Sequence, residues 1–69
     1  MTTAQQVEMA AAFCHMSKTS LASALGMKRQ SFYMKLKRDT LTRSELEKIG
    51  EAMGGKYVVY FEFPDGTRV

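Results

Sequence analysis

Several residue types are scarce in this chain of 69 residues, which has one cysteine, one histidine, one proline and no tryptophan. The single cysteine, Cys14, rules out a disulfide within the chain and favours a reducing compartment. Cys14 and His15 are too few ligands for a zinc site within one chain, so we expect no metal. The longest apolar run, residues 9–14, is far shorter than the roughly 20 residues that cross a bilayer. With no secretion signal visible at the N-terminus, the sequence predicts a soluble, cytoplasmic protein with no membrane segment.

Features typical of catalysis and of cofactor binding are also missing. The chain has no glycine-rich loop for phosphate groups, and its carboxylates fall mostly on the outer face of one predicted helix rather than in facing pairs. We therefore expect no enzyme activity, no cofactor and no small-molecule ligand. What is present is a hydrophobic share of 45%, which suffices for one small core and predicts a single domain over residues 1–69.

Positive charge is concentrated in one stretch of the chain. Residues 17–43 hold seven lysines and arginines against one aspartate, a net charge of +6, while residues 1–16 carry −1 and residues 44–69 carry −2. A basic stretch alone indicates a solvated face. Its coincidence with the turn motif described next favours the binding of phosphate groups.

The same stretch has the spacing of two short helices packed across a tight turn. Ala22 is placed where the helices touch, and Gly26, four residues later, can take the left-handed turn conformation. Phe32 would then anchor the second helix in the core. This is the spacing of a helix-turn-helix unit, whose second helix enters the major groove of DNA.

Helix signals elsewhere complete a mainly α-helical domain with four helices, over about residues 4–14, 18–25, 29–37 and 43–53. Three of these helices have an N-terminal capping residue, in chain order Thr2 or Thr3, Ser17, and Thr42 with its capping-box partner Glu45. Gly50 lies inside the fourth helix, where it costs about 1 kcal/mol relative to alanine. Close approach of another backbone would explain its presence.

The last residues change to strand-like periodicity and predict a β-hairpin over about residues 56–69. Residues 56–63 are rich in β-branched and aromatic side chains and predict one long strand; residues 64–66 predict a turn, and residues 67–69 a short return strand. Tyr57, Val59, Phe61 and Phe63 share the face that suits a core. The opposite face carries Val58, Tyr60 and Glu62. Because the return strand covers at most three residues, an open edge remains for a second chain, and we expect this opposite face to mediate a homodimer.

With these elements in place, the chain resembles the phage Cro and repressor type of helix-turn-helix protein, the lambda-repressor-like domains, over about residues 4–54. The resemblance is carried by residues 21–27 (LASALGM) and by residues 44–54 (SELEKIGEAMG), which look like the family's fourth helix. Lys28 departs from the family's usual capping serine or threonine. The hairpin replaces the family's fifth helix, as in β-tailed Cro-like members, several of which dimerise through the tail.

The resemblance also implies which side chains meet DNA. Arg29 and Gln30, at the start of the third helix, would meet base edges; arginine suits guanine O6/N7 and glutamine suits adenine N6/N7. Tyr33 and Met34 can touch a thymine methyl group or a sugar, although Tyr33 can equally pack against the fourth helix. Candidate phosphate contacts come from basic side chains and one helix cap: Ser17, Lys18, Lys28, Lys35, Lys37 and Arg38.

Two hypotheses follow. In the first, which the resemblance implies, the protein is a small transcriptional regulator of phage or mobile-element type, repressor-like, that binds double-stranded DNA sequence-specifically as a homodimer. In the second, it is a protein-interaction module that uses the open strand edge, and the helix-turn-helix is a scaffold. The net charge of +6 on residues 17–43 favours the first hypothesis, because a scaffold has no need of it.

Overall fold

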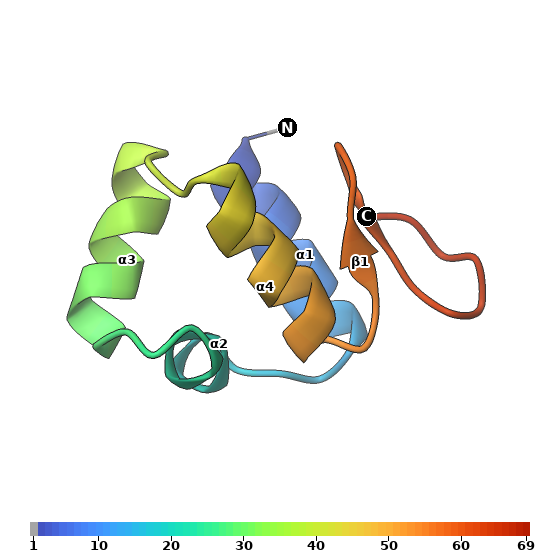
Figure 1. Ribbon diagram of the computed structural model, residues 1–69, viewed down its shortest axis with the longest axis horizontal. Helices are drawn as coiled ribbons and strands as arrows, with labels where there is room; N and C mark the ends of the chain where they lie inside the picture. The colour runs from blue at the N-terminus through green and yellow to red at the C-terminus, as the bar shows by residue number, and fades with distance from the viewer. Residues whose placement is uncertain (1) are drawn as a thin grey trace.

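The computed structural model describes residues 2–69 as four helices followed by a small antiparallel hairpin (Figure 1). In chain order the elements are α1 (Thr3–Phe13), α2 (Lys18–Ala24), α3 (Arg29–Arg38), α4 (Arg43–Ala52), β1 (Lys56–Tyr57) and β2 (Phe61–Glu62). The predicted fold class, mainly helical with a C-terminal hairpin, is confirmed. Each helix begins and ends within one residue of its predicted bounds.

Side-chain caps explain where three of the helices begin. The hydroxyl oxygens of Thr2, Ser17 and Thr42 each accept a backbone N–H of the first turn of α1, α2 and α4 respectively. The caps of α1 and α4 are complete capping boxes, and the second is the one that the sequence predicts. Lys28 begins α3 with no side-chain cap. The position of α3 therefore depends mainly on its packing and on contacts from neighbouring helices.

One hydrophobic core joins the four helices to the tail. Its largest fully buried side chains are Phe32, Phe61, Leu21, Ile49 and Val7. These come from α3, β2, α2, α4 and α1 respectively, so every helix contributes to the same core. Burial of each such side chain contributes about 1.5–3 kcal/mol, and no single helix buries enough surface to be stable alone.

The C-terminal segment differs from the predicted long strand. The chain reverses at residues 58–60, where the Val58 amide donates a hydrogen bond of 2.7 Å to the Tyr60 carbonyl oxygen. Residues 56–63 therefore form two short strands, β1 and β2, which pair antiparallel. The reversal also changes which side chains face inward, since Val59, expected in the core, is 70% exposed at the tip of the hairpin.

The expected open edge is absent from this tail. The predicted turn at residues 64–66 does return the chain along β2, and Phe61 and Val69 exchange two backbone hydrogen bonds of 2.8 Å. In the described chain β2 thus has β1 on one side and residues 67–69 on the other. A second chain has no long strand edge to join, so the basis on which Val58, Tyr60 and Glu62 were expected to mediate dimerisation is wrong.

Two of those three side chains are engaged within the tail itself. The Arg68 guanidinium lies over the Tyr60 ring, 4.9 Å from its centroid. The Glu62 carboxylate pairs with Lys56 Nζ at 3.2 Å and with Arg68 Nε at 3.5 Å. These contacts, chiefly the hydrogen bond from Lys56, lower the pKa of Glu62. Of the predicted dimerisation residues, Val58 alone is classed as exposed.

Backbone contacts hold the tail against the end of α4. A Cβ atom at Gly50 would lie 2.7 Å from the Tyr57 nitrogen, so the expected close approach of another backbone is confirmed. A Cβ at Gly55 would lie 2.1 Å from the Glu62 carbonyl oxygen, which leaves no room for any side chain there. Gly50 therefore lets β1 pack directly on α4, and Gly55 lets β2 lie against the segment that joins α4 to β1.

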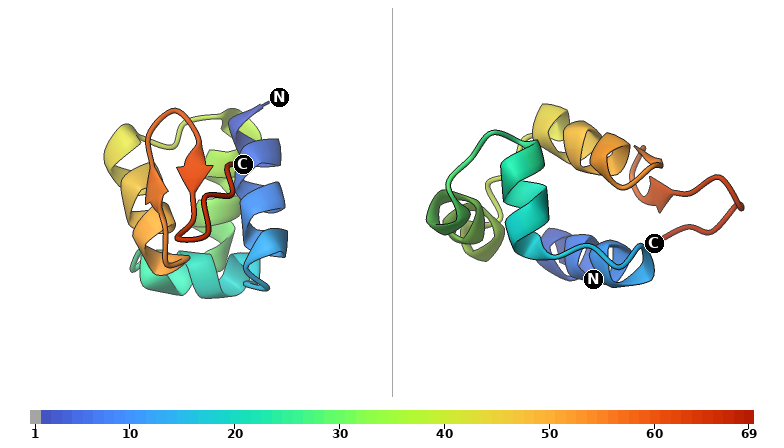
Figure 2. Two further views of the ribbon diagram at one scale, coloured as in Figure 1. Left: turned by 90° about the vertical axis from the view of Figure 1, so that its right-hand side faces the viewer. Right: turned by 90° about the horizontal axis from the view of Figure 1, so that it is seen from below.

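The tail and α3 occupy opposite ends of the molecule, which measures 31 × 21 × 19 Å between its outermost Cα atoms. Figure 1, with the longest axis horizontal, shows α3 at the left and the tail at the right. Seen from the tail end, the hairpin lies between α1 and α4 (Figure 2, left). This separation leaves the outer surface of α3 far from the tail.

Candidate nucleic-acid interface

A short turn positions α3 across α2. The Met27 amide donates to the Ala22 carbonyl oxygen at 2.9 Å, and the Gly26 amide to that of Ser23 at 3.0 Å. Gly26 has φ +69°, the left-handed conformation expected at this turn. Ala22 is 1% exposed, as expected of a small side chain at the contact between helices. In Figure 1 α2 is seen nearly end-on and α3 from the side, so the two helices cross.

A narrow stripe attaches α3 to the core. Phe32 and Leu36, one turn apart, are its two buried residues, at 0% and 7% exposure. Lys35 is half-buried, and the remaining seven positions of α3 are exposed. Most of the surface of α3 is therefore open to a partner.

All four predicted base-contacting residues lie on this open surface. Arg29 and Gln30 are exposed in the first turn of α3, while Tyr33 and Met34 are 42% and 38% exposed. The alternative position for Tyr33, packed against α4, stays a prediction. Its ring lies beside α2, where Lys18 Nζ is 5.6 Å from the ring centroid.

Three of the predicted phosphate contacts are exposed cations, namely Lys28, Lys37 and Arg38. Within residues 2–69, no carboxylate lies within ion-pairing distance of these side chains or of Arg29. Lys28 stands just before the first turn of α3, whereas Lys37 and Arg38 stand in its last turn. Uncompensated positive charge thus flanks the base-contacting candidates at both ends of the helix.

Lys18 differs from these cations because it already has partners. Its ammonium pairs with the Glu8 carboxylate of α1 at 2.7 Å, and this hydrogen bond raises the pKa of Lys18. The same ammonium lies near the Tyr33 ring. Lys18 therefore links α1, α2 and α3 at the border of the open surface. Both partners of the ion pair are partly exposed, at 40% and 47%, so the lysine can still exchange Glu8 for a phosphate.

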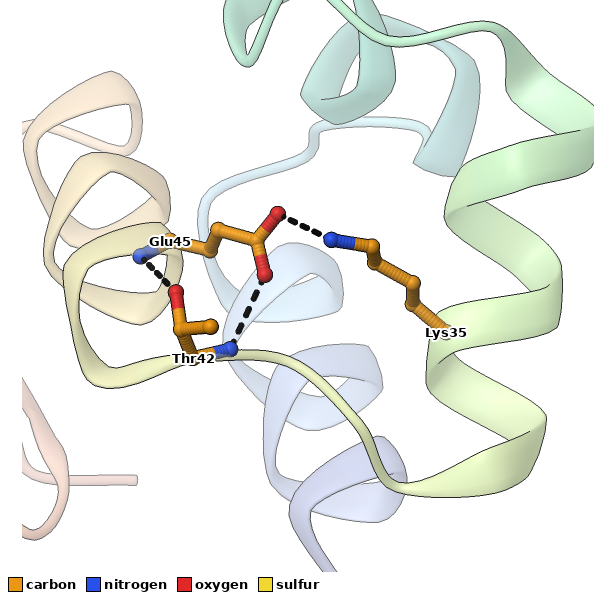
Figure 3. Close-up of polar contacts among 3 residues, drawn as sticks. All are labelled: Lys35, Thr42 and Glu45. Carbon is orange, nitrogen blue, oxygen red and sulfur yellow. Dashed lines mark hydrogen bonds and ion pairs between the residues drawn. The ribbon is translucent and has the colours of Figure 1, made fainter.

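Lys35 is more firmly held, by the start of α4 (Figure 3). Its ammonium donates to Glu45 Oε2 at 2.6 Å, while Glu45 Oε1 accepts the Thr42 amide at 2.9 Å. The hydrogen bond from Lys35, followed by that from Thr42, lowers the pKa of Glu45. The capping box of α4 therefore also fixes α3, and the structure gives Lys35 a positioning contact that its sequence neighbourhood does not suggest.

Ser17 is likewise committed to its own helix. Its hydroxyl oxygen accepts the Ser20 amide at 3.0 Å and lies 3.0 Å from the Ser20 hydroxyl. Of the six predicted phosphate contacts, the structure thus leaves three with no carboxylate partner in the described chain, pairs two with carboxylates and uses one as a helix cap. The two pairing carboxylates, Glu8 and Glu45, were not among the residues singled out for this surface. Glu8 lies on a different helix, while Glu45 was assigned only to its capping box.

A metal site and a membrane-spanning helix are both absent from the part of the chain that the structure describes. Residues 2–69 contain no group of three or more histidine, cysteine, aspartate or glutamate side chains arranged to hold a metal ion. None of the described helices combines the length and the apolar character that crossing a membrane requires. Comparison of the chain with protein-family models, with curated proteins and with solved structures found no match. The surface of α3 is therefore interpreted from its own geometry and chemistry.

Proposed function

We propose that this protein binds double-stranded DNA sequence-specifically by placing α3 in the major groove. The observation that carries the proposal is the surface of α3, which presents side chains able to read bases between cations that have no carboxylate partner among residues 2–69. Cations of this kind neutralise phosphates and release counterions, which supplies sequence-independent affinity. Polar side chains at the centre of the surface supply discrimination between bases.

Each candidate base contact has a matching chemistry. The Arg29 guanidinium can donate two hydrogen bonds to O6 and N7 of guanine, and the Gln30 amide can pair with N6 and N7 of adenine. Met34 follows Gln30 by one helical turn and offers an apolar contact to a thymine methyl group. Tyr33, held beside Lys18, is placed to touch a sugar or a methyl group at the border of the same surface.

The resemblance to the Cro and repressor type of protein supports a regulatory role. The four helices follow in the order and with the short turn that this resemblance implies, and a hairpin follows them. We therefore extend the proposal to a small transcriptional regulator, repressor-like and of phage or mobile-element type, that acts in the cytoplasm as a homodimer. The alternative, an interaction module that adds a partner strand, is favoured less, because β2 has neighbours on both sides and the edges at β1 and residues 67–69 are short.

Salt titration of binding to duplexes selected from a random pool tests the proposal. Binding should weaken steeply with salt, and Lys37→Ala should reduce the log–log slope by about 0.9. Arg29→Ala should cost about 1–3 kcal/mol on the selected duplex and much less on random DNA. Lys56→Ala is the matched control, because it removes one positive charge at the opposite end of the molecule and should leave both quantities nearly unchanged. A slope near zero for the unmodified protein would exclude DNA binding.

A further inference from the structure

The large hydrophobic side chains exposed on the described chain form two groups. Tyr33 and Met34 belong to α3 and lie among the cations described above. The other four lie on α1 and at the tip of the hairpin, and we call them the α1–tip face: Met9, Phe13, Val58 and Val59. Met9 is 52% exposed and Val59 70% exposed, so both could bury much more surface against a partner.

Two contacts join α1 to the tail along this face. The Gln6 side-chain amide donates to the Val59 carbonyl oxygen at 3.0 Å, which places the hairpin tip beside the first turns of α1. Further along α1, the Phe13 ring packs on Phe63 with centroids 4.5 Å apart. Met9 follows Gln6 by three residues and precedes Phe13 by four, so it lies on the same side of the helix between the two contacts. The two contacts thus hold the hairpin tip and the exposed side of α1 on adjoining parts of the surface.

The composition of the hairpin tip indicates that a binding partner covers it. Exposed tight turns favour glycine, asparagine and aspartate, which satisfy the turn conformation and interact with water. Here two successive valines occupy the tip, and neither belongs to the core. Within residues 2–69 the two valine side chains therefore leave apolar surface exposed to solvent.

The distribution of charge favours a second copy of the chain, rather than a nucleic acid, as the partner of this face. Glu8 is the one charged residue of α1 and is paired with Lys18, while Glu62 in the tail is paired with Lys56 and Arg68. Residues 56–69 hold Lys56 and Arg68 against Glu62 and Asp65, a net charge of zero, so the α1–tip face is close to neutral, whereas residues 17–43 carry +6. Two copies of the chain can meet at the neutral face without repulsion but would repel one another at α3. A nucleic acid, conversely, gains little from the neutral face.

The position of the face is compatible with a second copy and bound DNA together. In the view from below (Figure 2, right), α1 runs along one flank of the molecule and α3 lies at one end. A copy placed against α1 and the hairpin tip therefore leaves the outer surface of α3 open in both protomers.

We infer that the α1–tip face is the surface through which two copies of this chain associate, around a two-fold axis beside Met9 and Val59. The inference rests on the homodimer part of the proposed function and names its interface. In this dimer the two copies associate through side chains of α1 and the hairpin tip, not through strand addition at the tail. A contact around a two-fold axis uses the same patch on both copies, so it requires one self-complementary apolar patch.

Sedimentation equilibrium of the unmodified protein and three variants tests this inference. Met9→Glu and Val59→Glu should each raise the dimer dissociation constant at least tenfold, because each places a carboxylate close to its own symmetry mate. Met34→Glu is the matched control, since it changes an exposed methionine of similar size on α3 and should leave the dimer dissociation constant unchanged. Circular dichroism melts verify folding of each variant, and Val59 is exposed enough for its substitution not to disturb the core.

The outcomes separate this interface from DNA binding. Met9→Glu should lose dimerisation but retain weak, salt-dependent binding to a single half-site, whereas Met34→Glu should dimerise normally and bind DNA poorly. If the protein is monomeric at millimolar concentration and on its selected duplex, or if the dimer survives both Met9→Glu and Val59→Glu, the inferred interface is wrong. Absence of DNA binding from a protein whose dimer responds to these variants would instead remove the proposed function and leave the interface intact.

Discussion

The two ends of this molecule are attached to the core in different ways. At one end, α3 buries two side chains, Phe32 and Leu36, and leaves most of its surface exposed and several of its cations without a carboxylate partner among residues 2–69. At the other end, backbone packs on backbone at Gly50 and Gly55, and the two cations of the tail, Lys56 and Arg68, both pair with the Glu62 carboxylate. The α3 end therefore leaves polar and charged side chains exposed to solvent, whereas the charged side chains of the tail contact one another.

Because the two ends are attached differently, we expect substitutions to affect stability and recognition differently at each end. On α3, stability resides in a narrow stripe and the proposed recognition in the remaining surface, so substitutions should change the two properties separately. In the tail, side chains and backbone share the same contacts, so most changes there should affect stability first. The predictions below test this contrast, beginning with the largest expected effect.

Phe32→Ala should destabilise the domain by about 3–5 kcal/mol, because it removes a fully buried ring and leaves a cavity. Met34→Ala, two residues away on the same helix, should change stability by less than about 0.5 kcal/mol, since its side chain is substantially exposed. Urea unfolding followed by circular dichroism gives both values. Comparable losses for the two variants would mean that α3 is not attached through one stripe.

Gly50→Ala should destabilise the domain by about 1–3 kcal/mol, although alanine normally favours a helix interior by about 1 kcal/mol. The new Cβ would lie 2.7 Å from the Tyr57 nitrogen, so β1 must move away from α4. Gly26→Ala provides the comparison, because its Cβ meets nothing within 4 Å and the cost comes from φ +69° alone. A Gly50→Ala protein that is more stable than the unmodified one in denaturant would show that the tail does not press on α4.

Glu8→Gln should have the smallest effect of these substitutions. It should change DNA binding, not stability. Loss of this carboxylate frees Lys18 from its 2.7 Å ion pair, so we expect affinity to rise a few-fold and the salt slope to steepen by about 0.9. Glu51→Gln on α4 makes the same change in net charge without freeing a lysine. Fluorescence anisotropy at several salt concentrations distinguishes the two, and equal slopes for both variants would show that Lys18 does not reach a phosphate.

The helical part of the fold could be predicted because its signals are local. A capping hydroxyl at Ser17 or Thr42 acts within its own first turn, and the spacing from Ala22 to Gly26 fixes a turn between adjacent helices. Even the unusual Gly50 could be interpreted, since a glycine inside a strong helix pattern implies a close neighbour. The exposed positions of α3 followed from helical periodicity once Phe32 was placed in the core.

The tail could not be predicted in the same way. Valine and tyrosine favour strands wherever they occur, and a turn at residues 58–60 without glycine, asparagine or aspartate carries no signal of its own. The reversal depends instead on contacts with distant parts of the chain, such as the hydrogen bond from Gln6 to Val59. The ion pairs of Lys18 and Lys35 were missed for a related reason, because each partner carboxylate lies on another helix.

The attachment of α3 has a consequence for how such a protein can evolve. Seven of its ten positions are exposed, while Phe32, Leu36 and the contact from Lys35 to Glu45 hold the helix in place. A descendant that keeps these few anchors can exchange the remaining side chains one at a time without passing through an unfolded intermediate form. Under the proposed function, new DNA targets are therefore reachable through single substitutions on one helix, while the rest of the molecule stays unchanged.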